Sequence, residues 1–148
     1  MNVEEVIKTD KKIPLESRTI IHLSLVHNHI NEVITATLKP FEVSLQQFNV
    51  LRILRGQMGK PANLSTLNER MVTKMSNTTR LVDKLISKEY VDRIVCPSNR
   101  RKVEIRITPE GEKALSKMDV AMKEAERYVL KNLEPQDLEH LNDLLDKF

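Results

Sequence analysis

The sequence predicts a mainly α, α+β domain in which four helices precede one β-hairpin and two helices follow it. Apolar residues recur every three or four positions through most of the chain, as they do in amphipathic helices. The period changes to alternation only between residues 91 and 108, which indicates two strands. A length of 148 residues with 40% hydrophobic and 30% charged residues fits one globular domain. No apolar stretch approaches the length of a bilayer crossing, so we expect no membrane partner.

The first two helices are indicated by an apolar stripe and by a capping box. A helix is expected over residues 16–38, before Pro40, because its apolar residues fall on one stripe: Leu23, Val26, Ile30 and Val33. Ser44 followed by Gln47 predicts a capping box at the start of a second helix. Gly56 stands where a left-handed helix stop is expected.

Two further helices are separated by a tight turn. Asn63 or Ser65 can cap the first of them, and only residues 72–75 lie before the next helix, for which Ser76 is a good N-cap. That next helix has one apolar side, and its opposite side is polar and cationic: Asn77, Arg80, Lys84 and Ser87 or Lys88. The pattern favours a helix pair whose second member presents a cationic outer face.

The alternating segment predicts a hairpin with an arginine-rich turn. Residues 91–96 are rich in β-branched side chains, and residues 103–108 alternate apolar with polar. The turn between them contains Arg100 and Arg101. We therefore expect two cationic side chains at the tip of a β-ribbon.

Two helices complete the chain. Thr108 as N-cap and Pro109 in the first turn open a helix that reaches about residue 132. Its length of roughly 35 Å exceeds what one small domain covers on one side, so a partner subunit is implied. Pro135 starts the last helix, whose stripe is Leu138, Leu141, Leu145 and Phe148.

Charge is concentrated in the middle of the chain. Residues 1–59 carry seven Lys or Arg against six acids, residues 60–106 eleven against five, and residues 107–148 six against ten. The three segments are therefore about +1, +6 and −4, which sum to the net charge of +3. A basic middle favours a polyanion partner such as nucleic acid, although a solvated cationic face is the alternative on charge alone.

The order of the elements separates these alternatives. A helix pair joined by a tight turn and followed by a basic hairpin is a winged helix-turn-helix. An α-helix fits the major groove of B-DNA, and a cationic hairpin beside it can approach phosphates or the minor groove. The sequence therefore predicts a double-stranded DNA-binding lobe over about residues 41–108, flanked by helices at 16–38 and 109–148.

Three stretches carry a resemblance to a known family. Residues 76–85 read Ser-Asn-Thr-Thr-Arg-Leu-Val-Asp-Lys-Leu, residues 91–93 Val-Asp-Arg, and residues 99–111 run from Asn-Arg-Arg-Lys to Thr-Pro-Glu-Gly. They resemble the MarR (multiple antibiotic resistance regulator) family of homodimeric transcription regulators. In this family the DNA-reading helix, here about residues 76–88, is called the recognition helix, and the hairpin is called the wing. Two positions depart from the family pattern: Asn99 replaces an Asp before the wing residues Arg100 and Arg101, and Glu89 replaces a Gly after the recognition helix.

The resemblance implies a winged helix-turn-helix lobe with N- and C-terminal dimerisation helices, no enzymatic activity and no cofactor or metal. The expected dimerisation residues are Leu23, Val26, Ile30, Leu138, Leu141 and Leu145. The expected DNA-binding residues, on the start and outer side of the recognition helix and on the wing, are Lys74, Ser76, Asn77, Thr78, Thr79, Arg80, Lys84, Asn99, Arg100, Arg101 and Lys102. Structural roles are favoured for three positions: Ser76 as a cap, Thr79 as half-buried, and Asp83 as a partner of Lys84 or Arg80.

Other interpretations are weaker. Ser24 and His27 suggest a nucleophile with its base, but no carboxylate orients the histidine. His22 and His29 lie about 10 Å apart on a helix, too far for one ion. Cys96, the single cysteine, is more often an apolar filler than a redox sensor.

The regulator interpretation brings further expectations. No secretory signal is visible, which favours a cytoplasmic protein. A small-molecule effector between the dimer helices and the lobe is a hypothesis, as is a repressor role. The competing class is a winged-helix module that binds an acidic protein.

Overall fold

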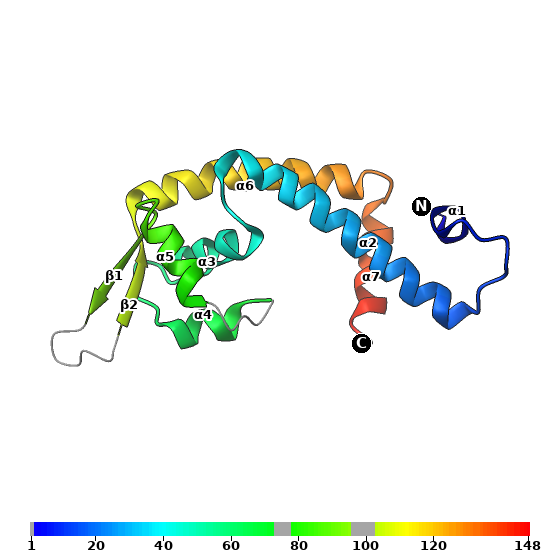
Figure 1. The fold of residues 1–148 in the computed structure, drawn as a ribbon, viewed down its shortest axis with the longest axis horizontal. Helices are drawn as coiled ribbons and strands as arrows, with labels where there is room; N and C mark the ends of the chain where they lie inside the picture. The colour runs from blue at the N-terminus through cyan, green and yellow to red at the C-terminus, as the bar shows by residue number, and fades with distance from the viewer. Residues whose placement is uncertain (1, 73–77, 96–102) are drawn as a thin grey trace. The chain divides into compact units, whose positions relative to one another are not determined.

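The computed structural model describes residues 2–72, 78–95 and 103–148 and shows a mostly helical fold with one small antiparallel sheet (Figure 1). Its elements are α1 (Val3–Ile7), α2 (Leu15–Leu38), η1 (Lys39–Phe41), α3 (Leu45–Gly56), α4 (Leu64–Arg70), α5 (Thr78–Ile86), β1 (Val91–Val95), β2 (Val103–Ile107), α6 (Pro109–Leu130) and α7 (Pro135–Leu145). Contacts divide the chain into a terminal unit, Met1–Ala36 with Ala125–Phe148, and a lobe, Thr37–Glu124. The predicted fold class is confirmed.

The core of the lobe forms between its helices and the sheet. α3 contacts α4, α5 and β2, and α5 also contacts β1. Fully buried side chains come from each of these elements: Phe48, Leu51, Leu67, Val82, Leu85, Val91 and Ile105. Burial of these apolar stripes fixes the apolar side of α5 inward, so the opposite side of that helix must face solvent.

The start of α3 agrees with the sequence and its end does not. The Ser44 hydroxyl accepts from the Gln47 N–H at 3.2 Å, and the Ser44 N–H donates to Gln47 Oε1 at 2.9 Å, so the capping box is confirmed. Gly56, however, is the last helical residue and is not left-handed. The positive φ angles fall two and three residues later, at Met58 (50°) and Gly59 (79°), so the expected left-handed stop at Gly56 is wrong.

In the described residues, the start of α4 and the two strands agree with the sequence prediction. Of the two candidate caps for α4, Asn63 is the one used: its side chain accepts from the Thr66 N–H at 2.9 Å. β1 and β2 pair antiparallel from Val91 with Ile107 to Val95 with Val103. The loop before α4 joins this sheet through Ala62, which exchanges two backbone hydrogen bonds with Ile105, of 2.7 and 2.9 Å. The hairpin is thereby anchored to the segment that leads into α4.

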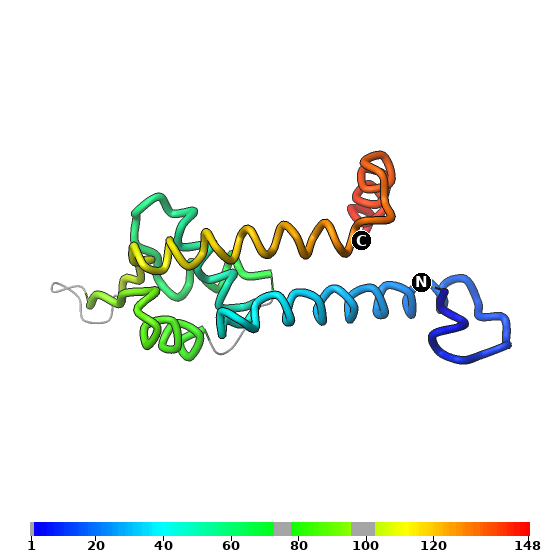
Figure 2. Tube along the Cα trace, turned by 90° about the horizontal axis from the view of Figure 1, so that it is seen from above, coloured from blue at the N-terminus to red at the C-terminus, as the bar shows by residue number. Residues whose placement is uncertain are grey.

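Thr108 connects the hairpin and the helix before it to α6. Its hydroxyl oxygen accepts from the Gly111 N–H at 2.9 Å, which confirms the predicted N-cap. The same hydroxyl donates to the Glu89 carbonyl at 2.7 Å. α6 then runs as one continuous helix and ends at Leu130, two residues before the expected end (Figure 2). Its buried side is Leu115, Met118, Met122 and Ala125.

The terminal unit contains an element that the sequence does not predict. The short helix α1 is capped by Asn2 and buries Val3. Arg18 of α2 holds it with a bidentate contact to Glu4, Nε to Oε1 at 2.7 Å and Nη2 to Oε2 at 3.1 Å. Across the described residues, no helix is long and apolar enough to cross a membrane.

Candidate nucleic-acid interface

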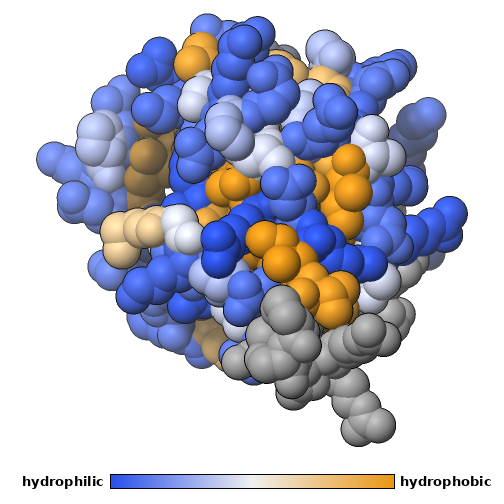
Figure 3. Space-filling model, turned by 90° about the vertical axis from the view of Figure 1, so that its left-hand side faces the viewer, coloured by the Kyte–Doolittle hydropathy of each residue, from blue (hydrophilic) through white to orange (hydrophobic). Residues whose placement is uncertain are grey.

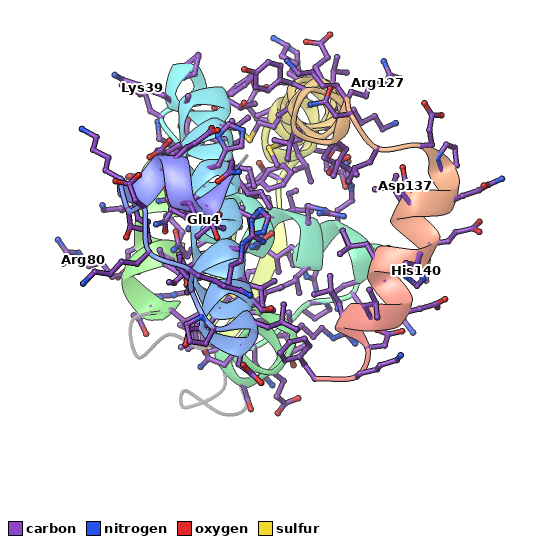
Figure 4. All side chains as sticks on the ribbon, turned by 90° about the vertical axis from the view of Figure 1, so that its right-hand side faces the viewer. Glu4, Lys39, Arg80, Arg127, Asp137 and His140 are labelled. Carbon is purple, nitrogen blue, oxygen red and sulfur yellow. The ribbon has the colours of Figure 1, made fainter. Side chains whose placement is uncertain are left out.

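The helix α5 has one buried and one exposed side. Val82 and Leu85 are fully buried in the lobe core. Thr79, Arg80 and Lys84 are exposed, and the Arg80 side chain extends away from the helices into solvent (Figure 4). This is the arrangement that a recognition helix requires, because its outer side chains must reach base edges and phosphates in the major groove.

Thr78 does not lie on the outer side, contrary to the sequence expectation. It is 5% exposed, and its hydroxyl donates to Asn68 Oδ1 of α4. The reason is its position: Thr78 precedes Val82 and Leu85 by four and seven residues, so it extends their buried stripe. Thr79, expected to be half-buried, is exposed instead. The two neighbouring threonines therefore exchange their expected environments.

Asp83 pairs with a residue that the sequence analysis did not consider. Its Oδ1 lies 3.0 Å from Nη2 of Arg93 in β1, whereas the expected partners were Lys84 and Arg80. The ion pair links the recognition helix to the first strand of the hairpin. In the part of the chain that the structure describes, neither Arg80 nor Lys84 has a carboxylate within ion-pair distance.

Several other cations of the lobe are neutralised by ion pairs, in contrast to Arg80 and Lys84. Lys88 Nζ lies 3.0 Å from Glu42 Oε2, and Arg106 Nη2 lies 3.6 Å from Glu104 Oε2. Arg55 of α3 pairs with Asp119 of α6. Positive charge without a neighbouring carboxylate is therefore present on the outer side of α5, where a polyanion would be attracted.

The hairpin exposes both apolar and charged side chains. Ile94 and Val95 are exposed on β1, and apolar atoms interrupt the mainly hydrophilic face at this end of the lobe (Figure 3). The turn that would approach DNA lies outside the described residues, as does Cys96. The predicted contacts that fall outside the description are Lys74, Ser76, Asn77, Asn99, Arg100, Arg101 and Lys102.

In the described residues, the geometry supports neither the nucleophile interpretation nor the metal-site interpretation. The Ser24 hydroxyl donates to the Ile20 carbonyl at 2.9 Å, and His27 Nε2 lies 3.0 Å from the Asn31 amide nitrogen, so the two are engaged separately. Within the described ranges, no three His, Cys, Asp or Glu side chains gather as a metal site would require.

The helix pair, its cationic outer face and the attached hairpin define a winged helix-turn-helix protein. The MarR family model matches residues 43–103, from the residues just before α3 to the first residue of β2. A transcriptional regulator of Bacillus subtilis, YpoP, is 33% identical over 90 residues, which are 61% of this chain and 59% of that relative. The chain is therefore similar to MarR-family transcriptional regulators of the helix-turn-helix type. Members of this family are DNA-binding transcription factors and not enzymes.

Solved structures share the fold at lower identity. MarR of Escherichia coli, as a cysteine variant complexed with operator DNA, superposes with a TM-score of 0.75 at 23% identity and covers 90% of this chain and 93% of that one. BpsR of Bordetella bronchiseptica, whose DNA binding is regulated by 6-hydroxynicotinic acid, has a TM-score of 0.79 at 18% identity, with 93% and 96% covered.

Proposed function

We propose that the chain is a sequence-specific, double-stranded DNA-binding repressor that acts as a homodimer on a pseudo-palindromic operator in the cytoplasm. The observation that carries this proposal is the exposed side of α5, where Arg80 and Lys84 stand without carboxylate partners among the described residues. Asp83 pairs with Arg93 instead, so both described cations of α5, Arg80 and Lys84, remain available to a polyanion. A dimer bound at an operator excludes other proteins from the same DNA, which is the basis of repression.

The terminal unit supports a homodimer. Among its described residues, only Val3 and Ala125 are buried. The residues expected at the dimer interface leave much apolar surface in solvent: Leu23, Val26, Leu141 and Leu145 are between 37% and 44% exposed. An apolar surface of this extent is stabilised by a second copy. A twofold dimer would place two recognition helices about 34 Å apart, one turn of B-DNA.

DNA contacts are proposed for two parts of the lobe, the recognition helix α5 with the residues before it and the wing. Arg80, Thr79 and Lys84 would face the major groove, with Ser76, Asn77 and Lys74 before them. The wing residues Asn99, Arg100, Arg101 and Lys102 would contact phosphates or the minor groove. Thr78 would act only by holding α5 against α4.

The test is duplex binding measured by fluorescence anisotropy, with DNA from upstream of the chain's own gene and a scrambled duplex for comparison. We expect Arg80→Ala to weaken binding to the upstream duplex by about 1–3 kcal/mol and to reduce its preference over the scrambled duplex. We expect Arg101→Ala to weaken binding to both duplexes and to lower the salt dependence by about one counterion.

Arg127→Ala is the matched control, because Arg127 is an exposed arginine of α6 outside the lobe. The affinity of the Arg127→Ala variant for each duplex should equal that of the unaltered chain. Equal affinity of all three variants for both duplexes would contradict the proposed interface.

A small-molecule effector is proposed as the regulator of DNA binding. BpsR, which shares the fold, is regulated in this way by 6-hydroxynicotinic acid. An effector that binds one form of the dimer more tightly would favour a spacing of recognition helices that no longer matches successive major grooves.

A further inference from the structure

The first strand of the hairpin has a backbone partner on one side only. β2 pairs with β1 and is joined on its other edge to Ala62, through the two backbone hydrogen bonds of Ile105. In the sheet that the structure describes, β1 pairs with β2 alone, so it is the edge strand. The chain passes from Val95, at the end of β1, into the segment that contains Arg100 and Arg101. A contact that holds β1 therefore also holds the base of the wing.

One ion pair joins this edge strand to the recognition helix. Arg93 lies two residues after the buried Val91 and opposite the buried Ile105, so its side chain starts on the face of the sheet that packs against α5 (Figure 1). There its Nη2 lies 3.0 Å from Oδ1 of Asp83. Asp92, one residue earlier, starts on the opposite face of the sheet and has no ion pair among the described residues. The charged contact with α5 is therefore made on one face of β1.

Asp83 is a negative charge in a surface that is otherwise suited to DNA. It follows Arg80 and precedes Lys84 in sequence, and its side chain is 53% exposed. A carboxylate at this place repels phosphates, so electrostatics alone would favour its absence. Its pairing with Arg93 also neutralises a cation of the same surface. The ion pair therefore needs a role other than the attraction of DNA.

We propose that Asp83 is a positioning residue for DNA binding, which holds β1 and the wing at a fixed orientation to the recognition helix. This inference rests on the proposed DNA-binding function. A recognition helix and a wing at a fixed orientation bind one duplex together, because the first contact holds the second close to its own site. Without the ion pair, β1 would keep its pairing with β2 but would move more freely against α5. The wing would then contribute less to the affinity.

The experiment compares Asp83→Asn with Asp92→Asn by fluorescence anisotropy on the upstream duplex. Each variant removes one negative charge, Asp83→Asn on the α5 side of β1 and Asp92→Asn on the opposite face. We expect Asp83→Asn to bind about threefold to fivefold more weakly than the unaltered chain, the upper range for a partly exposed ion pair. Asp92→Asn should bind as tightly as the unaltered chain or more tightly, because it only lowers the repulsion of phosphates.

Two further measurements identify positioning as the cause. The charge exchange, Asp83→Arg with Arg93→Asp, keeps the net charge and allows the pair to form again, so the affinity should return to within about twofold of the unaltered chain. Arg101→Ala should weaken binding less in the Asp83→Asn background than in the unaltered chain, because a displaced wing has less affinity to lose. Circular dichroism and thermal unfolding of each variant check that the lobe is folded.

Three results would overturn the proposal. Binding by Asp83→Asn that equals or exceeds that of the unaltered chain would show that Asp83 acts only as a repulsive charge. An undiminished effect of Arg101→Ala in the Asp83→Asn background would show that the wing does not depend on the ion pair. A folded charge-exchange variant that binds as weakly as Asp83→Asn would show that the pairing itself is not the cause.

The failure of this inference and the failure of the proposed function are distinguishable. If Arg80→Ala weakens duplex binding and Asp83→Asn does not, the DNA-binding proposal stands and the positioning role of Asp83 is wrong. If the unaltered chain binds no duplex, both are wrong.

Discussion

Glu89 holds a backbone conformation that favours glycine. Its φ is 61°, in the left-handed region, three residues after the end of α5. The Glu89 carbonyl accepts the Thr108 hydroxyl, so the conformation aligns a contact made by the backbone and not by the side chain. A side chain at this φ costs on the order of 1 kcal/mol relative to glycine.

We therefore expect Glu89→Gly to raise the free energy of unfolding by about 0.5–1 kcal/mol, measured by urea denaturation. The control is Ser87→Gly, two residues earlier, where φ is not positive. That change should lower stability, because glycine adds backbone freedom to the unfolded chain without relieving strain. Destabilisation by both substitutions would show that Glu89 is not strained.

The two helical glycines predict opposite effects of the same substitution. A Cβ added at Gly111 of α6 would overlap the carbonyl oxygen of Tyr90, whereas one added at Gly56 of α3 would meet nothing within 4 Å. Gly111→Ala should therefore lower the free energy of unfolding by about 1–3 kcal/mol, as overpacking does. Gly56→Ala should raise it by up to about 1 kcal/mol through helix propensity. Thermal unfolding of the pair tests the close approach, and equal effects would refute it.

At the scale of single residues, the sequence predicts some features of the candidate site and not others. The exposure of Arg80 and Lys84 follows from the helical period of α5 alone. The burial of Thr78 and the pairing of Asp83 with Arg93 do not, because each depends on another element that approaches α5 in space. A sequence pattern contains local spacing, and these contacts join residues ten positions apart in both cases.

At the scale of elements, the length of a helix or strand decides whether the sequence can predict it. α2 to α7 and both strands are predicted because each is marked by several apolar positions or by a cap. α1 and η1 are not, since five and three residues present too few positions for a period. The sequence misplaces the left-handed stop after α3, because Gly56 is still helical and the positive φ angles fall only at Met58 and Gly59.

The docking of α1 on α2 should depend on pH. The bidentate contact from Arg18 lowers the pKa of Glu4 below its ordinary value. A lowered pKa means that the contact is complete at neutral pH and is lost as the pH falls through the lowered value. We expect the Val3 methyl resonances to shift from buried to solvated positions in that range, measured by NMR.

Variants define the cause of that transition. Glu4→Gln should release α1 at pH 7 without acid, whereas Glu5→Gln, an exposed neighbour without an ion pair in the described structure, should titrate as the unaltered chain does. Val3 resonances that stay constant from pH 7 to pH 3 would show that the contact does not hold α1.

At the scale of the whole molecule, the two compact units differ in how completely they bury their apolar residues. The lobe forms its own core from α3, α4, α5 and the sheet. The described part of the terminal unit leaves the stripe of α7 in solvent, including Leu141, Leu144 and Leu145. A stripe of helical period that no element of its own unit covers supports the proposed homodimer, in which a twofold interface would contain each residue twice.

The dimer is therefore expected to be sensitive to charge on α7. Leu141→Asp with Leu145→Asp should weaken the dimer by about 3 kcal/mol or more, roughly a hundredfold or greater, because two apolar side chains per subunit lose their burial. Sedimentation velocity should detect monomer at micromolar concentration. Val120→Asp is the control, since Val120 is 61% exposed on α6 but belongs to the lobe, and this variant should remain dimeric.

The monomeric variant should bind a single half-site as well as the unaltered chain does. It should lose the additional affinity for two half-sites, because a folded lobe keeps its α5 surface while the linkage between two lobes is gone. A double variant that sediments as a dimer would place the interface elsewhere, and one that loses half-site binding as well would show that the lobe depends on the dimer to keep its fold.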